Sequence, residues 1–215
     1  MRKKKTMRGK ILSVAKKSFY EHGYSATTYI YLAKVLKTSP GSFSYYFSSK
    51  AALAGEVYQD VLYHLDLYVK DKVRECINDP LLHYAVVSRL WLELFRQDAS
   101  FFRFYYEFGR DDIEIARGFN LLRICDPTNG LIHYDESNDE RALITSATKG
   151  HSWFTNTAYF SGKLSTSYDY YCDYHLRTNL LLTRTPQDLI EEIILRSKNI
   201  VNSLHFTVLP YFTFQ

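Results

Sequence analysis

Cysteine is scarce in this chain of 215 residues, with three in all: Cys76, Cys125 and Cys172. They are far apart, form no CxxC pair and have no histidine at metal-ligand spacing. Such a scattered, odd set argues against a disulfide framework and against a zinc site, and it favours a reducing, cytoplasmic compartment. We therefore expect no metal ion and no cofactor.

Long apolar runs and catalytic motifs are also missing. No stretch of 18 apolar residues occurs, so the sequence predicts no membrane span. The basic residues 1–5 are followed by no apolar segment, so we expect no signal peptide. There is no GxSxG, HExxH, Walker A, GxGxxG or EF-hand pattern, and scattered histidines are more often structural than catalytic. We expect a protein that is not an enzyme and assign no catalytic residue.

Acidic residues are nearly absent from the first quarter of the chain. Residues 1–50 hold eleven Lys or Arg and one acid, Glu21, a net charge of +10, whereas the other residues hold 16 basic and 22 acidic side chains, a net charge of −6. A basic segment on an acidic body is typical of a protein that binds nucleic acid.

The stretch TTYIYLAKVLKTSPGSFSYYFSSK, residues 27–50, predicts two short helices joined by a tight turn, followed by the start of a third. Thr27 or Thr28 can cap the first helix, because a hydroxyl accepts a hydrogen bond from a backbone N–H without a helical partner. Ser39 and Pro40 favour the start of the second helix, since proline at the first position loses no hydrogen bond. The apolar positions of the first helix are Ile30, Leu32, Ala33, Val35 and Leu36.

The second of these helices has a thin apolar side, formed by Phe43 and Phe47 four residues apart. Its other positions are small, hydroxylic or tyrosine, and Gly41 near its start lets the backbone approach a partner closely. The N-terminal residues of a recognition helix enter the DNA major groove, and Tyr45 and Tyr46 are long enough to reach phosphate oxygens. The pattern indicates a helix-turn-helix.

Residues 10–60 resemble the DNA-binding domain of the TetR (tetracycline-repressor-like) family of bacterial transcription factors. The matching positions are Ile11, Ala15, Phe19, Gly23, Tyr24, Thr27, Leu32, Ala33, Ser39, Gly41, Phe43, Tyr46, Phe47, Lys50 and Leu53. Lys37 replaces the family's usual turn glycine, Ser44 a common phosphate-contacting tyrosine, and Tyr31 a frequent acidic residue. The resemblance implies an all-α fold: a three-helix DNA-binding domain over residues 1–50 and a larger helical domain for ligand binding and dimerisation over residues 51–215.

This resemblance and the pattern together predict the contacts with a double-stranded DNA operator. Residues 2–10 (RKKKTMRGK) would form a basic arm on the backbone or in the minor groove, or else a disordered, solubilising tail. Lys50 lies in the first turn of the third helix, where the helix dipole disfavours a cation, and a bound phosphate would offset that cost. The expected DNA contacts are Lys5, Thr27, Thr28, Ser39, Pro40, Gly41, Ser42, Ser44, Tyr45, Tyr46 and Lys50.

Helical spacing continues through most of the remaining chain. We predict helices over about 7–22, 49–77, 80–97, a short aromatic helix after Asp98, and helices near 112–122, 138–160, 168–183 and 186–206. Residues 125–137 lack a period, and the apolar, extended tail VLPYFTFQ is expected to pack on another part of the chain.

The body of the family holds an inducer pocket, and aromatic residues are abundant here, with 19 Tyr and 14 Phe. So many large rings favour a largely apolar cavity with some polar anchors, although an aromatic cluster at helical spacing is more often core. The expected ligand contacts are Trp91, Phe95, Phe102, Arg103, Tyr106, His151 and Phe154, with Arg103 able to hold an acidic group.

The last two helices would pair with their copies in a second subunit, as the resemblance implies, to form a four-helix interface. The expected interface residues are Tyr171, Tyr174, Thr178, Leu181, Leu189, Ile193, Ile200 and Leu204. Internal core packing explains the same apolar stripe, but a homodimer would let two recognition helices read a palindrome.

The sequence therefore predicts a homodimeric, ligand-responsive transcriptional regulator. We expect a repressor that a small, largely apolar or aromatic effector releases from its operator. The alternatives are a constitutive or activating DNA-binding regulator without an inducer pocket, and an enzyme on a borrowed helical fold.

Overall fold

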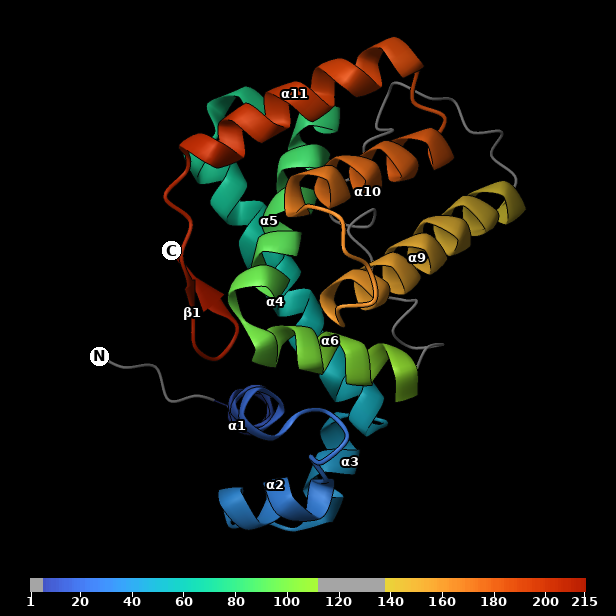
Figure 1. The fold of residues 1–215 in the computed structure, drawn as a ribbon. Helices are drawn as coiled ribbons and strands as arrows, with labels where there is room; N and C mark the ends of the chain where they lie inside the picture. Colours follow the sequence, from blue (N-terminus) through green and yellow to red (C-terminus); the bar gives the residue numbers. More distant parts are fainter. Residues whose placement is uncertain (1–5, 112–137) are drawn as a thin grey trace. The chain divides into compact units, whose positions relative to one another are not determined.

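The computed structural model describes residues 6–111 and 138–215 (Figure 1). Nearly all regular structure in these residues is helical, which confirms the all-α class. The chain divides into two compact units. Unit 1 takes in Met1–Val61, Asp98–Phe119 and Thr207–Gln215, and unit 2 takes in Leu62–Gln97 and Asn120–Phe206. The expected division of function at residue 50 stays a prediction.

Unit 1 contains α1 (Met7–His22), α2 (Tyr29–Leu36), α3 (Pro40–Tyr46), the first part of α4 (Lys50–Lys72) and α6 (Ala99–Asp111). Its core uses apolar side chains at helical spacing, as predicted for α1. The fully buried members are Ile11, Ala15, Phe19, Leu32, Phe43, Leu53, Val57, Phe101, Phe104 and Phe108. Helix α1 packs against α2 and α6, and α2 packs against α3.

Helix α1 begins at Met7, so residues 7–10 of the expected arm are helical, while residues 2–5 lie outside the described residues. The Thr6 hydroxyl caps the helix by accepting a hydrogen bond from the Gly9 backbone N–H at 3.2 Å.

At the other end of α1, Gly23 has φ +87°, and a Cβ there would lie 2.5 Å from an oxygen of Glu107. That carboxylate accepts a hydrogen bond from the Ser25 N–H at 2.8 Å. The backbone angle therefore requires glycine, and a side chain there would also displace the hydrogen-bonded carboxylate of Glu107.

The end of the chain forms a small antiparallel hairpin of β1 (Val208–Leu209) and β2 (Thr213–Phe214). Its turn residues Tyr211 and Phe212 both have left-handed backbone angles, with φ of 63° and 57°. Phe212 is buried, with its ring 5.0 Å from that of Phe104. The tail thus packs on α6 in unit 1, as the sequence predicted for an apolar segment.

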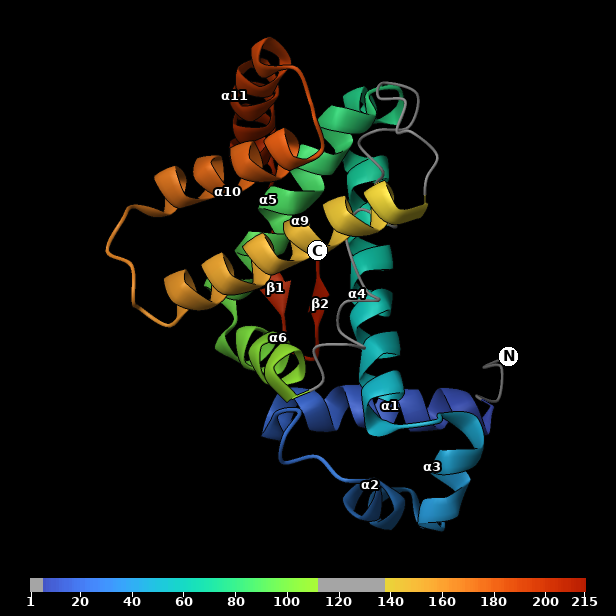
Figure 2. The ribbon, with the colours of Figure 1, turned by 90° about the vertical axis from the view of Figure 1, so that its right-hand side faces the viewer.

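Unit 2 contains the rest of α4, the 3₁₀ turn η1 (Arg74–Ile77), α5 (Pro80–Gln97), α9 (Asn138–Phe160), α10 (Tyr168–Leu182) and α11 (Gln187–Ser203). Helix α5 is buried on nearly every side and packs against α10 and α11, while α10 also packs on α9 (Figure 2). The prediction that this helix lies at the centre of the body is confirmed.

The predicted helices over 7–22, 80–97 and 138–160 are confirmed with these bounds. The helix expected over 49–77 is shorter: α4 ends at Lys72, because Val73 is extended with φ −122° and ψ 90°. The last helix ends at Ser203 instead of residue 206. The helix expected near 112–122, the irregular stretch 125–137 and Cys125 lie outside the described residues. No helix in the described ranges is long and apolar enough to cross a membrane.

Candidate functional site

Helices α2 and α3 form the predicted helix-turn-helix in unit 1. The Thr28 hydroxyl caps α2 by accepting a hydrogen bond from the Tyr31 N–H at 3.2 Å. Lys37 ends α2 in the left-handed conformation, φ 54° and ψ 48°, where the family pattern has glycine. Pro40 then starts α3 with Ser39 at the cap position, although the Ser39 side chain makes no capping bond.

One side of α3 is buried and the other is open. Phe43 and Phe47 are in the core, as the sequence predicted. Tyr45 is 82% exposed and Tyr46 is 37% exposed, and their rings contact each other edge to face at 4.9 Å. Because a tyrosine ring offers an apolar face and a hydroxyl donor together, this side of α3 is suited to a ligand surface.

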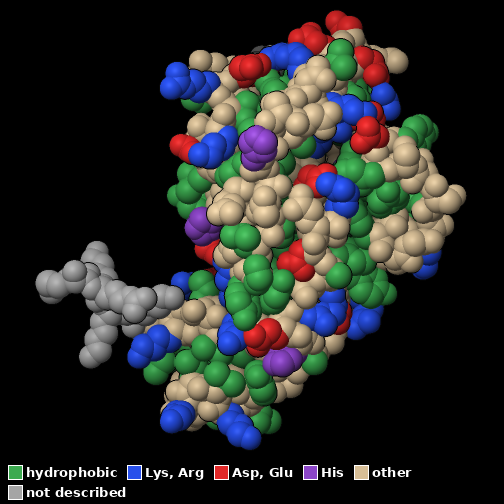
Figure 3. Space-filling view, turned by 60° about the vertical axis from the view of Figure 1, so that its left-hand side comes forward, with side chains coloured by type: hydrophobic (Ala, Val, Ile, Leu, Met, Phe, Trp, Pro, Cys, Tyr) green, Lys and Arg blue, Asp and Glu red, His purple; other side chains and the backbone are tan. Residues whose placement is uncertain are grey.

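The electrostatics of this surface favour an anion. No acidic residue occurs between Glu21 and Glu56, while Lys34 and Lys37 are exposed on and after α2. Figure 3 shows Lys and Arg side chains at the lower end of the view, where α2 lies in Figure 1. Lysine ammonium groups and tyrosine hydroxyls are both donors for phosphate oxygens. Sequence reasoning passed over both lysines, although the local lack of acids pointed to them.

Three of the expected DNA contacts have hydrogen-bond partners within the chain. Thr27 is fully buried, and its hydroxyl bonds to the Gly23 carbonyl at 2.7 Å and lies 2.9 Å from the Ser18 hydroxyl. Lys50 donates to the Tyr24 carbonyl at 3.1 Å, with its ammonium 4.0 Å from the centre of that ring.

The third of these residues is Ser42, whose hydroxyl lies 3.0 Å from that of Thr38 and 3.2 Å from that of Ser39. Lys5 lies outside the described residues. The remaining predicted contacts are exposed: Thr28, Ser39, Pro40, Gly41, Ser44, Tyr45 and Tyr46. These stay predictions as contacts with DNA, with Thr28 also serving as a cap. On α2 itself, Ile30 and Val35 were expected on the apolar side, but both are exposed.

The residues expected to line an effector pocket are not gathered at one place within a unit. Phe102, Arg103 and Tyr106 belong to α6 in unit 1, and Arg103 donates to the carbonyls of Tyr20 and Glu21 at 2.7 and 3.1 Å. Arg103 therefore stabilises the C-terminus of α1, and its role in holding an acidic group stays a prediction. The other four are in unit 2: Trp91 and Phe95 are buried, His151 is half-buried and Phe154 is 67% exposed.

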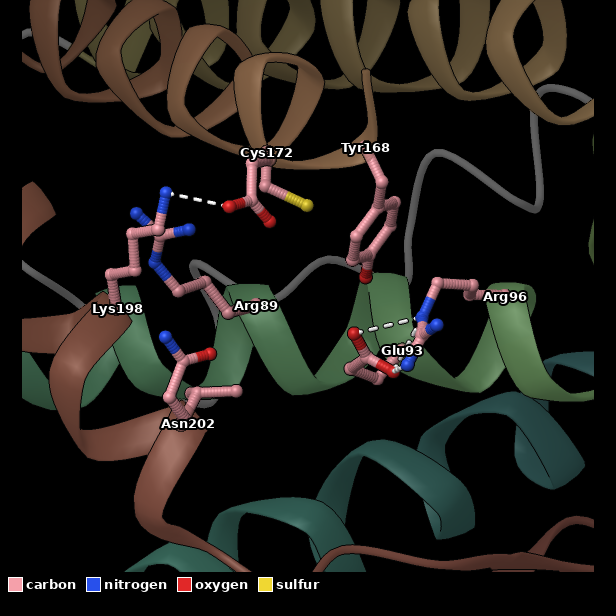
Figure 4. Close-up of a pocket in the computed structure, with 9 residues that line it drawn as sticks. Arg89, Glu93, Arg96, Tyr168, Cys172, Lys198 and Asn202 are labelled. Carbon is pink, nitrogen blue, oxygen red and sulfur yellow. Dashed lines mark hydrogen bonds and ion pairs between the residues drawn. The ribbon is translucent and has the colours of Figure 1, made fainter.

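Unit 2 contains a cavity of about 190 Å³ between α5, α10 and α11 (Figure 4). None of the seven expected contacts is among its described lining residues, which are mostly polar. They are Arg89, Glu93, Arg96, Tyr168, Asp169, Cys172, Lys198, Val201 and Asn202. Sequence reasoning missed this cavity because its charges come from three helices that are far apart in the chain.

Burial and charge set the chemistry of the cavity wall. Burial raises the pKa of the Cys172 thiol to about 12, so the thiol stays protonated. Burial also raises the pKa of the Tyr168 phenol, whose hydroxyl lies beside Glu93 and Cys172. The Lys198 ammonium holds the pKa of the Asp169 carboxyl below its usual value. The lining thus combines fixed charges with neutral hydroxyl and thiol groups.

The residues expected at a dimer interface divide by exposure. Tyr174 and Leu181 are exposed on α10. Tyr171 and Ile193 are buried in unit 2, and the Tyr171 hydroxyl is hydrogen-bonded to Asn156. Those two side chains therefore belong to the internal core, in place of the predicted surface. The other four are half-buried: Thr178, Leu189, Ile200 and Leu204.

A helix-turn-helix whose second helix presents an open, acid-free side is suited to binding DNA. Residues 11–57 match the model of the bacterial regulatory proteins of the tetR family. This match assigns residues 11–57, from α1 to the first part of α4, to the DNA-binding domain of that family. A comparison with curated proteins gave no match.

Three solved structures are similar to the chain. RolR in complex with its ligand resorcinol has 18% identity, a TM-score of 0.57, and coverage of 88% of this chain and 93% of that chain. FadR of Thermus thermophilus, a TetR-family transcriptional repressor in complex with lauroyl-CoA, has 16% identity, a TM-score of 0.49, and coverage of 94% and 96%. TylP of Streptomyces fradiae, a TetR regulator, has 19% identity, a TM-score of 0.35, and coverage of 90% of each chain.

Proposed function

We propose that this protein is a ligand-responsive repressor that binds a palindromic operator as a homodimer in the cytoplasm. The observation that carries the proposal is the open side of α3, with Tyr45 and Tyr46 exposed next to a segment free of acidic residues. The exposed hydroxyls of Ser39 and Ser44 add short donors at the same helix. Such a surface reads DNA through phosphate and base contacts of a recognition helix.

Release by a small molecule is the second part of the proposal. RolR, which shares this fold, has been solved with a small molecule bound. Helix α4 contributes residues to both compact units, so one continuous helix can carry a change in unit 2 to the DNA-binding unit. In this mechanism the effector binds one conformation of unit 2 more tightly and shifts the population toward it, and the operator binds the other. The sequence favoured a largely apolar or aromatic effector, which stays a prediction.

The test begins with an operator selected from a random DNA library by repeated binding to the full-length protein. Replacing Tyr45 with alanine removes a hydroxyl that could donate to a phosphate oxygen. For one lost hydrogen bond we expect roughly 2- to 12-fold weaker operator binding. The melting temperature should stay within about 1 °C, because surface substitutions change stability little. Tyr63→Ala is the matched control, since Tyr63 is also an exposed tyrosine, on α4 beyond the helix-turn-helix.

Equal effects of Tyr45→Ala and Tyr63→Ala on affinity would contradict the assignment of α3 as the recognition helix. Failure of the library to yield any enriched sequence would contradict sequence-specific binding as a whole. A salt titration adds an independent measure, because the slope of log affinity against log salt changes by about 0.9 for each phosphate contact. Lys34→Gln and Lys37→Gln should each reduce that slope.

A further inference from the structure

We infer that the cavity between α5, α10 and α11 binds a small organic monocarboxylate, and that this anion is the effector of the regulator. The inference rests on the proposed function and gives its effector a chemical class. It departs from the apolar or aromatic class favoured by the sequence, because the cavity presents charged and hydrogen-bonding groups from all three helices (Figure 4).

Arg89 is the fixed cation of the cavity. It is 5% exposed, and its Nε donates to the Ser197 hydroxyl at 2.9 Å. Its Nη2 donates to Asp173 at 2.5 Å and to the Ile194 carbonyl at 3.0 Å. Within the described part of the chain, no acceptor bonds to the remaining nitrogen, Nη1. A buried guanidinium held in place on one side, with donors left on the other, is pre-organised for an anion.

Lys198 supplies the second cation, from α11. Its ammonium lies 2.8 Å from Asp169 and 3.8 Å from Asp173. An ammonium has three donor hydrogens, so one remains for a ligand when Asp169 and Asp173 each take one. Asn202 lies one helical turn further along α11 and adds an amide to the same wall. Figure 4 shows Arg89 and Lys198 on the same side of the cavity.

The opposite side of the cavity carries a phenol, a thiol and an internal ion pair. Arg96 pairs with Glu93 at 2.8 Å and lies over the Tyr168 ring at 5.1 Å from its centre. Because the phenol of Tyr168 and the thiol of Cys172 have raised pKa values, neither carries a negative charge that would repel an anion. The ring of Tyr168 and the side chain of Val201 give the body of a small acid an apolar contact.

Charge and size select the ligand. Each of the three cations of the lining is paired with a carboxylate, Arg89 with Asp173, Arg96 with Glu93 and Lys198 with Asp169, so a ligand binds through the donors that these pairs leave open on Arg89 and Lys198. Burying an unpaired charge is costly, so one carboxylate that accepts from both donors is favoured over a dianion, whose second charge would have no donor to bind. A volume of about 190 Å³ corresponds to roughly six water molecules at ~30 Å³ each, which suits a compact acid.

The experiment measures binding of two acids, benzoate and 2-hydroxypropanoate, to the full-length protein by calorimetry. Benzamide and 2-hydroxypropanamide, which have the same shapes without the charge, are the matched neutral ligands. At least one acid should bind, at least about tenfold more tightly than its amide, since a charge-assisted hydrogen bond is lost in the amide. The same acid should weaken binding of the selected operator.

Two variants locate the site. Lys198→Met keeps the side-chain stem and should weaken binding of the acid about tenfold or more. Arg89→Met should do the same, with circular dichroism to check that this buried substitution still folds. The control is Arg196→Met, which removes another ion-paired cation of α11, bonded to Asp79 and Glu192 at 3.1 Å and not part of the lining. It should leave the affinity for the acid within about twofold.

If neither acid binds, or if Lys198→Met binds the acid as tightly as the natural protein, the inference is wrong, whatever the protein does with DNA. Binding that leaves operator affinity unchanged overturns the role of the anion as effector. Conversely, acid binding that depends on Lys198, in a protein for which no operator can be selected, supports the site and contradicts the proposed function. The two proposals thus fail separately.

Discussion

At the scale of single residues, the contact between α9 and α10 in unit 2 contains a buried imidazole, His175. It is 3% exposed, and its ring stacks on that of His151 at 5.3 Å. Neither of its ring nitrogens has a hydrogen-bond partner among the described residues. Burial, with a smaller contribution from the charge of His151, lowers the pKa of His175 to about 3. The folded protein therefore keeps this ring neutral.

This neutral ring predicts a loss of stability in mild acid. Histidine in an unfolded chain has a pKa of about 6.5. Below that pH, His175 therefore binds a proton in the unfolded chain but stays neutral in the folded protein. The free energy of unfolding should fall as pH drops from 6.5 toward 3, by up to about 1.4 kcal/mol per pH unit for His175. Denaturant unfolding between pH 7 and pH 5 measures the slope before most carboxylates titrate.

His175→Gln is the variant that isolates this effect. Glutamine cannot titrate, while His151 and every other group stay in place, so the difference between the two slopes belongs to position 175. We expect the variant to lose less stability than the natural protein between pH 7 and pH 5. Identical slopes would mean that the ring is protonated in the fold, and that a charge is accommodated between α9 and α10.

At the scale of elements, the C-terminal hairpin is part of the core of unit 1. The ring of Phe212 lies 5.3 Å from Phe101, 5.0 Å from Phe104 and 5.3 Å from Tyr20. Backbone hydrogen bonds between Thr207 and Gln215, at 2.8 and 3.0 Å, close the hairpin. Its last residues thus join α1 to α6.

Removing this contact should destabilise unit 1. Phe212→Ala deletes a buried aromatic ring, which costs about 3–5 kcal/mol of the free energy of unfolding, measured in denaturant. Tyr211→Phe is the matched control at the neighbouring, exposed position. It removes only the hydroxyl that donates to Glu21 at 3.1 Å, and should cost less than about 1 kcal/mol. Equal, small effects of both changes would show that the hairpin is not part of the folded core.

The elements themselves were largely predictable from the sequence, because each has a local signal. Pro80 marks the start of α5, and the spacing of apolar residues marks α1. The helix-turn-helix could be found for the same reason, since Pro40 and the pair Phe43 and Phe47 lie within one short stretch. Local capping and periodicity decide such elements before any tertiary contact forms.

The contents of the sites were less predictable, because they depend on partners distant in the chain. Nothing near Arg103 indicates that it bonds to the carbonyls of Tyr20 and Glu21. Likewise, Arg89 meets Asp173 across 84 positions of sequence, and only the packing of α5 on α10 and α11 brings them together. Thr27 fits a cap by pattern, but the neighbouring Thr28 takes that role and leaves Thr27 in the core.

At the scale of the whole molecule, the proposed dimer needs an apolar surface that the monomer leaves open. On α10, Tyr170, Tyr174 and Leu181 are 62%, 45% and 51% exposed. Their separations of four and eleven residues place them on the same side of a helix with 3.6 residues per turn. Leu195 is 61% exposed on the neighbouring helix α11. Such a row is suited to pairing with a second copy across a two-fold axis.

Leu181→Asp should dissociate this dimer without unfolding the chain. Burial of a leucine is worth about 1.5–3 kcal/mol, and a two-fold interface contains each side chain twice, so the change should cost several kcal/mol of association. Light scattering at micromolar concentration should find a dimer for the natural protein and a monomer for the variant. The monomer should keep its circular dichroism spectrum and bind the operator weakly, because one recognition helix reads half of a palindrome.

Ile193→Asp is the informative contrast, because Ile193 is buried within unit 2. An aspartate there places a charge in the core, and its cost should exceed the free energy of unfolding. We therefore expect an unfolded protein instead of a folded monomer. Both variants add one aspartate, at an exposed position in α10 for Leu181 and at a buried position in α11 for Ile193. A natural protein that is monomeric, or a Leu181→Asp variant that stays dimeric, would show that subunits do not pair through this side of α10.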